Sequence, residues 1–421
     1  MLEKILIRRK FIRRKAMLQT KFLQAKNLII LVIIFAGITR LWSLDYPNAY
    51  VFDEVYHAFT AKEYLNLSKD AWDPYAKPPE GVAFEWTHPP LAKEFMAISM
   101  YITNSREGWA WRSPGAILGI FSVYLVYLLG MKLLSSRLGA VLAAFIYSLD
   151  GLNFVQSRTG MNDVYFVTFM LATLLFLLHK KYFLSAIFLG LSLSSKWAAV
   201  YLFLIIFPIL LKDRRYLNIA YFIILPPIIY VLTYVPYFLL GFNIDQFISL
   251  QKQMWWYHTG LKATHGYSSP WWSWPLNLYP VWYFVDYLNN KIANIFASGT
   301  STVYWFGSIA LILSAFEIFK KKSANLLLII LGFLAFWLPW AASPRIMFLY
   351  HFSPSVPFLA LALGNKLSQL FEDKKTQRIA ILLLLIMFAN FILVYPFLVG
   401  IPQTRSVVDI FFLTNGAKNP F

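Results

Sequence analysis

The feature that most constrains the fold is a series of apolar runs, each roughly twenty residues long, which recur along most of the chain. Of 421 residues, 59% are hydrophobic and only 14% are charged. Runs of this length are what a helix needs to cross a bilayer, where its backbone groups must bond to one another. The sequence therefore predicts an all-α polytopic membrane protein.

Counting about twenty residues per span predicts eleven transmembrane helices. The apolar stretch 27–44 is longer than the core of a signal peptide and lacks a small-residue cleavage site, so we expect a retained first helix. The segment 182–211 fits two short spans or one bent span, and the Lys-rich sequences on both sides favour two. The predicted helices are 27–44, 109–132, 137–153, 160–179, 182–197, 198–211, 215–240, 303–319, 324–342, 346–365 and 378–399.

The distribution of basic residues predicts the orientation. The net charge is +18, but the Lys and Arg residues cluster between apolar runs, which indicates membrane topology and not nucleic-acid binding. With a cytoplasmic N-terminus at 1–26, 23 of the 38 Lys and Arg residues fall on the cytoplasmic side. We therefore expect a multi-pass protein of the plasma membrane, with the segments 45–108 and 241–302 on its outer face.

The first outer segment carries much of the polar chemistry. It holds ten of the twenty acidic residues, and it contains helical patterns at 55–65 and 91–103, the second directly after a double proline. Asp53 and Glu54 follow the first membrane helix, and adjacent carboxylates point in different directions, so one can act as a base while the other binds a partner. The absence of cysteine excludes a catalytic thiol, a thiolate metal site and a disulfide.

A second motif follows within the same outer segment. His88 precedes two prolines that fix the backbone, and Lys93 stands five residues after it. The alternative is that His88 or Thr87 caps the next helix while Lys93 extends its charge towards the interface. Both residues are candidates for binding the donor or the acceptor.

Three cations stand where a lipid-facing helix would avoid them, namely Arg112, Lys196 and Arg345. The predicted topology puts all three near the outer ends of different helices, where they could converge on a phosphate, although each alone could be an ordinary cation at a helix end. His351, after Arg345, is either a packing residue or a further hydrogen-bond donor to the phosphate. Asp163 begins the fourth helix and could interact only with the helix dipole, or could bind substrate.

The second outer segment is rich in aromatic residues. Part of this pattern is the usual aromatic belt of a membrane interface, but its density beside a histidine exceeds what a belt requires. Aromatic faces also stack against sugar rings. The candidate sugar-binding or acceptor-binding residues here are His265, Trp271, Trp272 and Trp274.

In their order along the chain, these residues resemble the protein O-mannosyltransferase family, which uses polyprenyl- or dolichyl-phosphate-mannose. The resemblance implies a GT-C glycosyltransferase fold with eleven membrane helices and a cytoplasmic N-terminus. It matches the family's acidic pair to Asp53 and Glu54, and its required arginine to Arg112. Eukaryotic members carry a β-trefoil domain where this chain has only 241–302, which is too short for one, so the resemblance implies a minimal prokaryotic form with a single membrane domain over 1–421. The matching stretches are 52–55, 88–93, Arg112 with Gly115 and Gly119, 190–197, 269–275 and 344–357.

The implied reaction is transfer of mannose from polyprenyl-phosphate-mannose to Ser or Thr hydroxyls of secreted or membrane proteins. A sugar phosphate already has a good leaving group, so cations are needed more than a general acid. We assign Asp53 as the base, Glu54 as the group that positions the acceptor, and Arg112, Lys196, Arg345 and His351 as contacts of the donor phosphate. A single displacement would invert the anomeric centre.

Three alternatives remain open from the sequence. A GT-C enzyme could use a lipid-linked glycan or a polysaccharide as acceptor, and a transporter could bind the lipid phosphate without chemistry. A divalent cation could bind Asp53, Glu54, His57 and His88, whose oxygen and imidazole ligands suit several metals, although their spacing has no fixed metal signature. We therefore assign no metal ligand and no firm cofactor.

Overall fold

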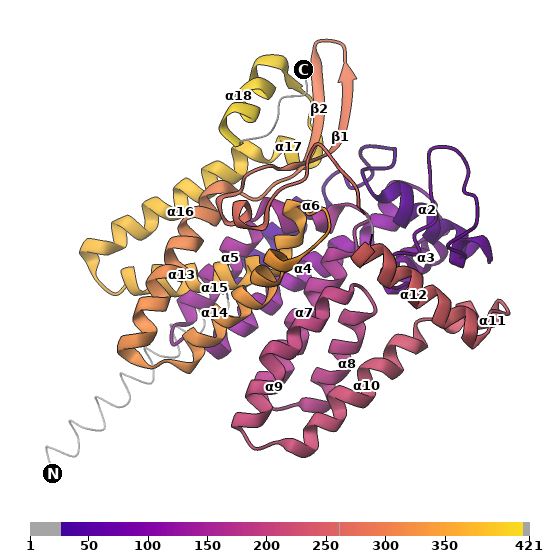
Figure 1. Cartoon of the computed structure of the whole chain (residues 1–421). Coiled ribbons are helices and arrows are strands. Elements are labelled where there is room, and N and C mark those ends of the chain that lie inside the picture. The colour runs from indigo at the N-terminus through magenta and orange to yellow at the C-terminus, as the bar shows by residue number, and fades with distance from the viewer. Residues whose placement is uncertain (1–26, 261, 416–421) are drawn as a thin grey trace, which may run out of the picture.

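The computed structural model describes residues 27–260 and 262–415 and is predominantly helical (Figure 1). The predicted cytoplasmic N-terminus, 1–26, lies outside the described residues. Most of the long helices run in similar directions through one body, and a β-hairpin projects from one end of it (Figure 1).

Every apolar segment predicted to cross the membrane is largely helical in the structure. Within the described part of the chain, four helices are long and apolar enough to span a bilayer by themselves, and a bent pair would make a fifth. Five further apolar helices are shorter, so the predicted number of eleven spans is not confirmed. The corresponding helices are Asn27–Leu41, α4 (Gly108–Leu133), α5 (Arg137–Ser148), α6 (Gly151–Arg158), α7 (Asp163–Leu178), α8 (Tyr182–Leu193), α9 (Phe203–Lys212), α10 (Ile219–Leu232), α11 (Val235–Leu239), α13 (Ser301–Lys321), α14 (Ala324–Trp337), α15 (Val356–Leu370), α16 (Lys374–Val394) and α17 (Pro396–Val399).

Several predicted helices are broken near the end of the body that holds the outer segments. The predicted helix 137–153 is the pair α5 and α6, which meet at 61°. Asp150 caps α6 by accepting hydrogen bonds from the backbone N–H groups of Leu152 and Asn153, so the chain begins a new helix instead of extending the old one. The segments after α8 and α14 continue as short 3₁₀ turns, η2 (Trp197–Leu202) and η5 (Leu338–Ala342).

The centre of the helical body is closely packed. Helix α7 is buried along nearly its whole length, and α5 packs tightly against α15. At that crossing, a Cβ on Gly364 would lie 2.6 Å from the carbonyl oxygen of Gly139, so only glycine allows the two backbones to approach this closely. Such contacts are typical of helix packing inside a membrane, where small residues replace the hydrophobic drive that operates in water.

The two helical patterns predicted in the first outer segment are confirmed as α2 (Glu54–Leu65) and α3 (Leu91–Thr103). Pro90 is the N-cap of α3, in agreement with a helix start after the double proline. A short 3₁₀ turn, η1 (Asp70–Trp72), lies between them.

The second outer segment departs from the all-α prediction. It begins with α12 (Ile244–Gly260), passes through η4 (Trp271–Leu276), and forms an antiparallel hairpin of β1 (Val281–Leu288) and β2 (Lys291–Ala297). A short strand, β3 (Gln403–Thr404), pairs with β2 ahead of α18 (Arg405–Asn415). The molecule is predominantly helical, but this segment forms strands, because β1 is rich in aromatic and β-branched residues and β2 supplies a pairing partner adjacent in sequence.

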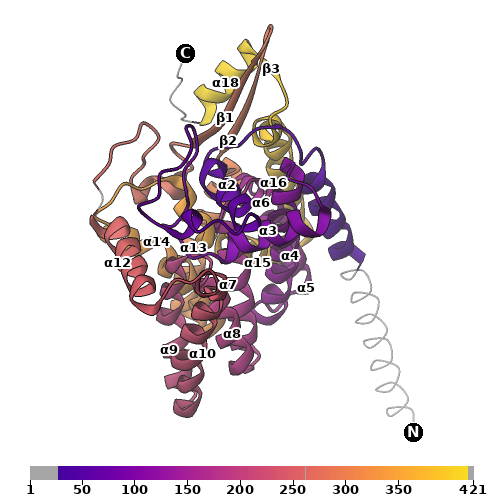
Figure 2. The ribbon, with the colours of Figure 1, turned by 90° about the vertical axis from the view of Figure 1, so that its right-hand side faces the viewer.

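Helix α12 carries its apolar residues on one face. Phe247, Leu250 and Met254 lie on one face and are buried against a cluster that includes Trp72 and Tyr234. The contact joins the second outer segment to the first. Both views place α2, α18 and the hairpin at the end of the molecule opposite to the connection between α9 and α10 (Figures 1 and 2).

Candidate active site

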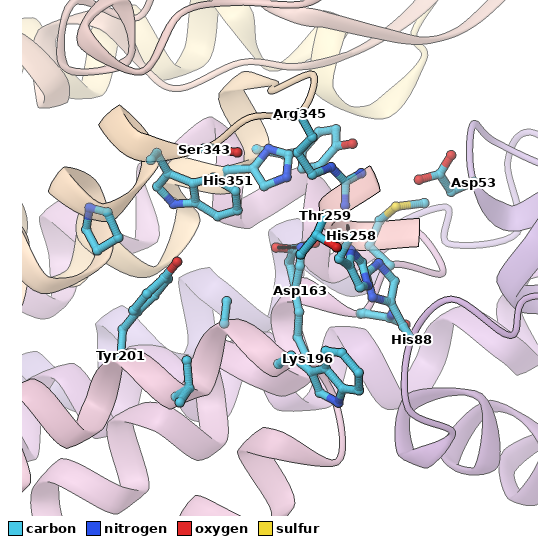
Figure 3. Close-up of a pocket in the computed structure, with 18 of the residues that line it drawn as sticks. Asp53, His88, Asp163, Lys196, Tyr201, His258, Thr259, Ser343, Arg345 and His351 are labelled. Atoms are coloured by element: carbon cyan, nitrogen blue, oxygen red, sulfur yellow. Dashed lines mark hydrogen bonds and ion pairs between the residues drawn. The ribbon is translucent and has the colours of Figure 1, made fainter. Parts of the chain in front are cut away.

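A cavity of about 410 Å³ lies where the outer segments meet the broken ends of the helices (Figure 3). Its walls come from the start of α2, the loop before α3, the turn before α7, η2, the end of α12, the start of β1, and the chain from η5 to η6 (Leu349–Ser355). Polar lining residues are Asp53, His57, His88, Asn162, Asp163, Lys196, His258, Thr259, Ser343, Arg345 and His351.

Asp53 lies on one side of the cavity, away from Lys196 (Figure 3). It is the N-cap of α2, but its side chain makes no capping hydrogen bond, and among the described residues it has no ion pair. Although part of its surface is open to the cavity, the surrounding protein raises the pKa of Asp53 to about 7, with nearby Glu85 adding to the effect of burial. A carboxylate with such a pKa can accept a proton near neutral pH.

Glu54 and Arg112 do not line the cavity, and both are essentially inaccessible to solvent. The Arg112 guanidinium contacts both carboxylate oxygens of Glu54, at 2.8 Å from Nε and 2.7 Å from Nη2. It also donates to the backbone carbonyls of Leu44, Pro47 and Ala49. Because these bonds occupy its donors, Arg112 is not placed to contact a donor phosphate directly, contrary to the expectation from the sequence.

Hydrogen bonds within the protein also occupy the carboxylate of Glu54. It accepts hydrogen bonds from the backbone N–H groups of Val51 at 2.8 Å and Gly160 at 2.9 Å. Glu54 therefore joins the start of α2 to the turn before α7 and to Arg112 in α4. Its carboxylate is turned away from the cavity, so the geometry does not place Glu54 to position an acceptor there, contrary to the expectation from the sequence.

Lys196 enters the cavity because helix α8 ends just before it. The hydroxyls of Ser194 and Ser195 donate to carbonyls four residues earlier, and the backbone of Lys196 is then extended, with φ −157°. Its Nζ lies 2.9 Å from Oδ1 of Asp163, which begins α7. The two residues therefore form a buried ion pair in the cavity wall.

Arg345 lies in the loop between η5 and η6, and two contacts hold its guanidinium. Its Nη1 hydrogen-bonds with Nδ1 of His258, and the group lies 5.4 Å from the centre of the Tyr257 ring. Among the described residues, Arg345 has no carboxylate partner, unlike Lys196. It is therefore the cation of the cavity with charge available for an anion.

Three imidazoles stack along one side of the cavity. The ring centres of His57 and His88 are 6.2 Å apart, and those of His88 and His258 are 5.0 Å apart. Burial lowers the pKa of His57 and of His258 to about 4, and that of His88 well below its ordinary value. Within the described part of the chain, the buried Nδ1 atoms of His57 and His88 have no hydrogen-bond partner, so these neutral rings can bond to a ligand.

The remaining predicted residues separate into two groups. His351 lines the cavity and stacks on Trp274, but Trp274 itself is completely buried behind it. Lys93 is also completely buried, and its Nζ donates to the carbonyls of His88 and Pro89, so it shapes the loop that holds His88. Further residues that do not line the cavity are His265, Trp271 and Trp272, of which His265 and Trp272 are exposed.

Sequence reasoning did not single out several lining residues. His258 directly follows an aromatic run in an amphipathic helix, which is a signal comparable to the one used for His265, but only the packing of α12 shows which histidine enters the cavity. Trp255 and Thr259 lie in the same helix, Tyr283 lies in β1, and Tyr201 and Ser343 come from short turns whose direction the sequence does not specify. These residues are Tyr201, Trp255, His258, Thr259, Tyr283 and Ser343.

A metal site is not evident in the geometry. Among the described residues, no group of three or more His, Cys, Asp or Glu side chains is arranged to hold a metal ion. Glu54, one of the four ligands considered from the sequence, faces Arg112 instead of His57 and His88. The proposed set of four therefore does not converge.

Comparison with known proteins agrees with this architecture. Residues 30–262 match the family model described as dolichyl-phosphate-mannose-protein mannosyltransferase, and residues 242–411 match the C-terminal four-helix region of protein O-mannosyltransferases. The chain is 25% identical to the polyprenol-phosphate-mannose–protein mannosyltransferase of Mycobacterium tuberculosis, over 90% of this chain and 89% of that protein. It is 23% identical to the protein of the same name from Corynebacterium glutamicum, over 80% and 82% respectively.

Solved structures show the same fold. The Saccharomyces cerevisiae protein O-mannosyltransferase Pmt1-Pmt2 complex bound to the sugar donor superposes with a TM-score of 0.81 at 14% identity, covering 94% of this chain and 93% of that chain. The ArnT structure from Cupriavidus metallidurans gives a TM-score of 0.60 at 13% identity, covering 82% of this chain and 60% of that one. These likenesses identify the GT-C glycosyltransferase fold.

Proposed function

This chain belongs to the dolichyl-phosphate-mannose-protein mannosyltransferase family, and from this premise we propose how its cavity carries out the reaction. It is a membrane glycosyltransferase that transfers mannose to proteins. We propose that its donor is polyprenyl-phosphate-mannose, that the acceptor is a Ser or Thr hydroxyl, and that the cavity opens on the outer face of the plasma membrane.

The observation that carries the mechanism is the separation of charges in the cavity. Counting only residues 27–260 and 262–415, Asp53 is a carboxylate without an ion pair, and Arg345 is a cation without a carboxylate partner. The cavity between them is lined by neutral, hydrogen-bonding rings, including His57 and His88. A sugar phosphate fits this arrangement with its phosphate towards Arg345 and its anomeric carbon towards Asp53.

In the proposed step, the acceptor hydroxyl gives its proton to the Asp53 carboxylate, and its oxygen forms a bond to the anomeric carbon. The bond from that carbon to the phosphate oxygen breaks, and the phosphate leaves with the electron pair. Arg345 stabilises the growing negative charge, together with Lys196, which Asp163 holds in the cavity wall. Attack and departure on opposite sides of one carbon invert its configuration.

The proposed roles of Glu54 and Arg112 differ from those of ligand-binding groups. Their buried ion pair fixes the backbone on which Asp53 stands, at a distance from the reacting atoms. They are positioning residues. Asp163 positions Lys196 in the same sense.

Substitution of Asp53 by asparagine tests the proposed base. Asp53→Asn keeps the size of the side chain but cannot accept the proton, so we expect transfer to fall by about 10²- to 10⁴-fold. Binding of the donor should persist, because Asp53 has no part in holding the phosphate. The assay uses radiolabelled polyprenyl-phosphate-mannose, a Ser/Thr peptide and the purified full chain, and wild-type transfer by the variant would remove Asp53 from the mechanism.

A further inference from the structure

His258 joins three separate parts of the protein at the cavity. It stands near the C-terminal end of α12, and its Nε2 lies 2.7 Å from the backbone carbonyl oxygen of Thr87 in the first outer segment. Its Nδ1 hydrogen-bonds with Nη1 of Arg345, from the loop between η5 and η6. Figure 3 shows His258 between Arg345 and His88.

These two partners define the protonation of the His258 ring. A backbone carbonyl can only accept a hydrogen bond, so Nε2 must carry the hydrogen that is donated to Thr87. A guanidinium can only donate, so Nδ1 must present its lone pair to Arg345. The ring is therefore neutral and has a single tautomer. Burial and the adjacent charge of Arg345 lower the pKa of His258 to about 4, which agrees with a neutral ring at physiological pH.

The same contacts restrict Arg345. Its long side chain is held at one guanidinium edge by His258 and at one face by the Tyr257 ring, and both residues belong to α12. A guanidinium has five N–H donors in a rigid plane, so fixing one edge also fixes the direction of the others. Holding the group before a ligand arrives removes part of the entropic cost of binding.

We propose that His258 is a positioning residue that presents the Arg345 guanidinium to the lipid-linked phosphate of the donor. This inference rests on the proposed role of Arg345 and extends it to a residue of the second outer segment. Helix α12 thereby contributes to the donor site indirectly, because His258 orients Arg345 and does not contact the phosphate.

A double-mutant cycle measures whether His258 acts through Arg345. The probe is polyprenyl phosphate without sugar, and the readout is its dissociation constant for the detergent-purified full chain. We expect Arg345→Ala to weaken binding by about ten- to a hundredfold, the worth of a hydrogen bond to a charged group. We expect His258→Ala to weaken binding by about three- to tenfold, the worth of immobilising one flexible side chain.

Whether the effects of the two substitutions are independent shows whether His258 acts through Arg345. If His258 acts through Arg345, adding His258→Ala to the Arg345→Ala variant should change the dissociation constant no further. If the two effects multiply, His258 affects binding by another route and the proposal is wrong. A merely structural loss at α12 would give that second result, because it would weaken binding in both backgrounds.

Two amide variants separate the two hydrogen bonds of His258. In His258→Asn, the side-chain oxygen can take the place of Nδ1 and accept from Arg345, while the bond to Thr87 is lost. In His258→Gln, the amide can reach the place of Nε2 and bond to Thr87, while the acceptor for Arg345 is lost. We expect asparagine to restore affinity relative to alanine and glutamine not to do so. The reverse order would assign the effect to the tie with Thr87 and overturn the proposal.

The cycle also distinguishes this inference from the proposed function. Coupling between His258 and Arg345 in a chain that transfers no mannose would support the inference and contradict the function. Normal mannose transfer without coupling between His258 and Arg345 would support the proposed function and contradict the inference. A wild-type chain that does not bind polyprenyl phosphate would contradict both.

Discussion

At the scale of single residues, the site divides the two adjacent carboxylates between different tasks. Asp53 faces the cavity and has no ion-pair partner among the residues that the structure describes, whereas Glu54 turns into the protein and bonds to Arg112 and two backbone N–H groups. Neighbouring residues at a helix start point in different directions, so one side chain can be reserved for chemistry while the next fixes the backbone beneath it.

The raised pKa of Asp53 predicts a pH profile. Its value of about 7 means that the carboxylate is mostly protonated, and unable to act as a base, below neutral pH. We therefore expect kcat to rise with pH up to about 7 and then to level off. The measurement is the rate of mannose transfer from pH 5 to 9 at saturating donor. A profile that falls as pH rises through 7 would show that the essential form is protonated, and the residual rate of Asp53→Asn should lack the rising limb.

The buried pair of Arg112 and Glu54 predicts an effect on stability. Arg112→Ala would leave the Glu54 carboxylate buried without its counter-ion, at a cost of about 3–5 kcal/mol. We expect a clearly lower unfolding temperature for the detergent-solubilised chain. Lys321→Ala is the control, because the Lys321 side chain is largely exposed and Glu317 keeps a second partner in Lys366, so its unfolding temperature should change much less. Normal stability of Arg112→Ala together with weakened donor binding would instead support a direct contact between Arg112 and the donor phosphate.

At the scale of secondary-structure elements, the site depends on where helices end. Asp163 begins α7, Lys196 follows α8, and Arg345 follows η5, so the ends of separate elements deliver the charged groups. Regular membrane helices satisfy their own backbone groups and expose apolar side chains to lipid, which leaves their ends and breaks as the places for polar residues. The crossing of α5 and α15 holds the body from which these ends project.

That crossing predicts the effect of one added methyl group. Gly364→Ala would put a Cβ 2.6 Å from the carbonyl oxygen of Gly139 and 2.7 Å from the backbone nitrogen of Ala143, so the helices must separate. We expect a loss of about 1–3 kcal/mol in the free energy of unfolding. Gly37→Ala is the matched control, because its Cβ would meet only Ile120 Cδ1, at 4.0 Å. Equal stability of the two variants would contradict the close packing.

At the scale of the whole molecule, the polar elements gather at one end. The first outer segment, the hairpin and α18 lie together, and the cavity is enclosed between these outer elements and the helical body (Figures 1 and 2). The basic connection between α9 and α10 lies at the other end. This polarity agrees with a protein that crosses a membrane in one fixed orientation.

Labelling of single cysteines tests the orientation. The chain has no cysteine, so Glu80→Cys and Lys212→Cys each introduce one thiol at an exposed position. We expect a membrane-impermeant maleimide to modify Glu80→Cys in intact cells and Lys212→Cys only after permeabilisation. Labelling of both in intact cells would mean that the two positions face the same side, and the reverse pattern would invert the proposed topology.

Residue type and order in the sequence identified many of the site residues, but not which of them interact with one another. The sequence predicted that Asp53, Lys196, Arg345, His88 and His351 belong together, and all of them line one cavity. The sequence also placed Arg112 in that set. An arginine that pairs with a buried glutamate and an arginine that binds a phosphate look alike in the sequence of a membrane helix. Only the fold shows which acid meets which base.

What the sequence by itself determined is the membrane architecture and the family. Apolar length, the placement of basic residues and local motifs are properties of the chain that do not depend on its folding, and they predicted the helical segments and the acidic segment 45–108, although the number of spans is not confirmed. The tertiary structure alone decided which charges are paired. Coulomb and hydrogen-bond energies depend on distances of a few ångströms between residues far apart in sequence, such as Glu54 with Arg112 and His258 with Arg345.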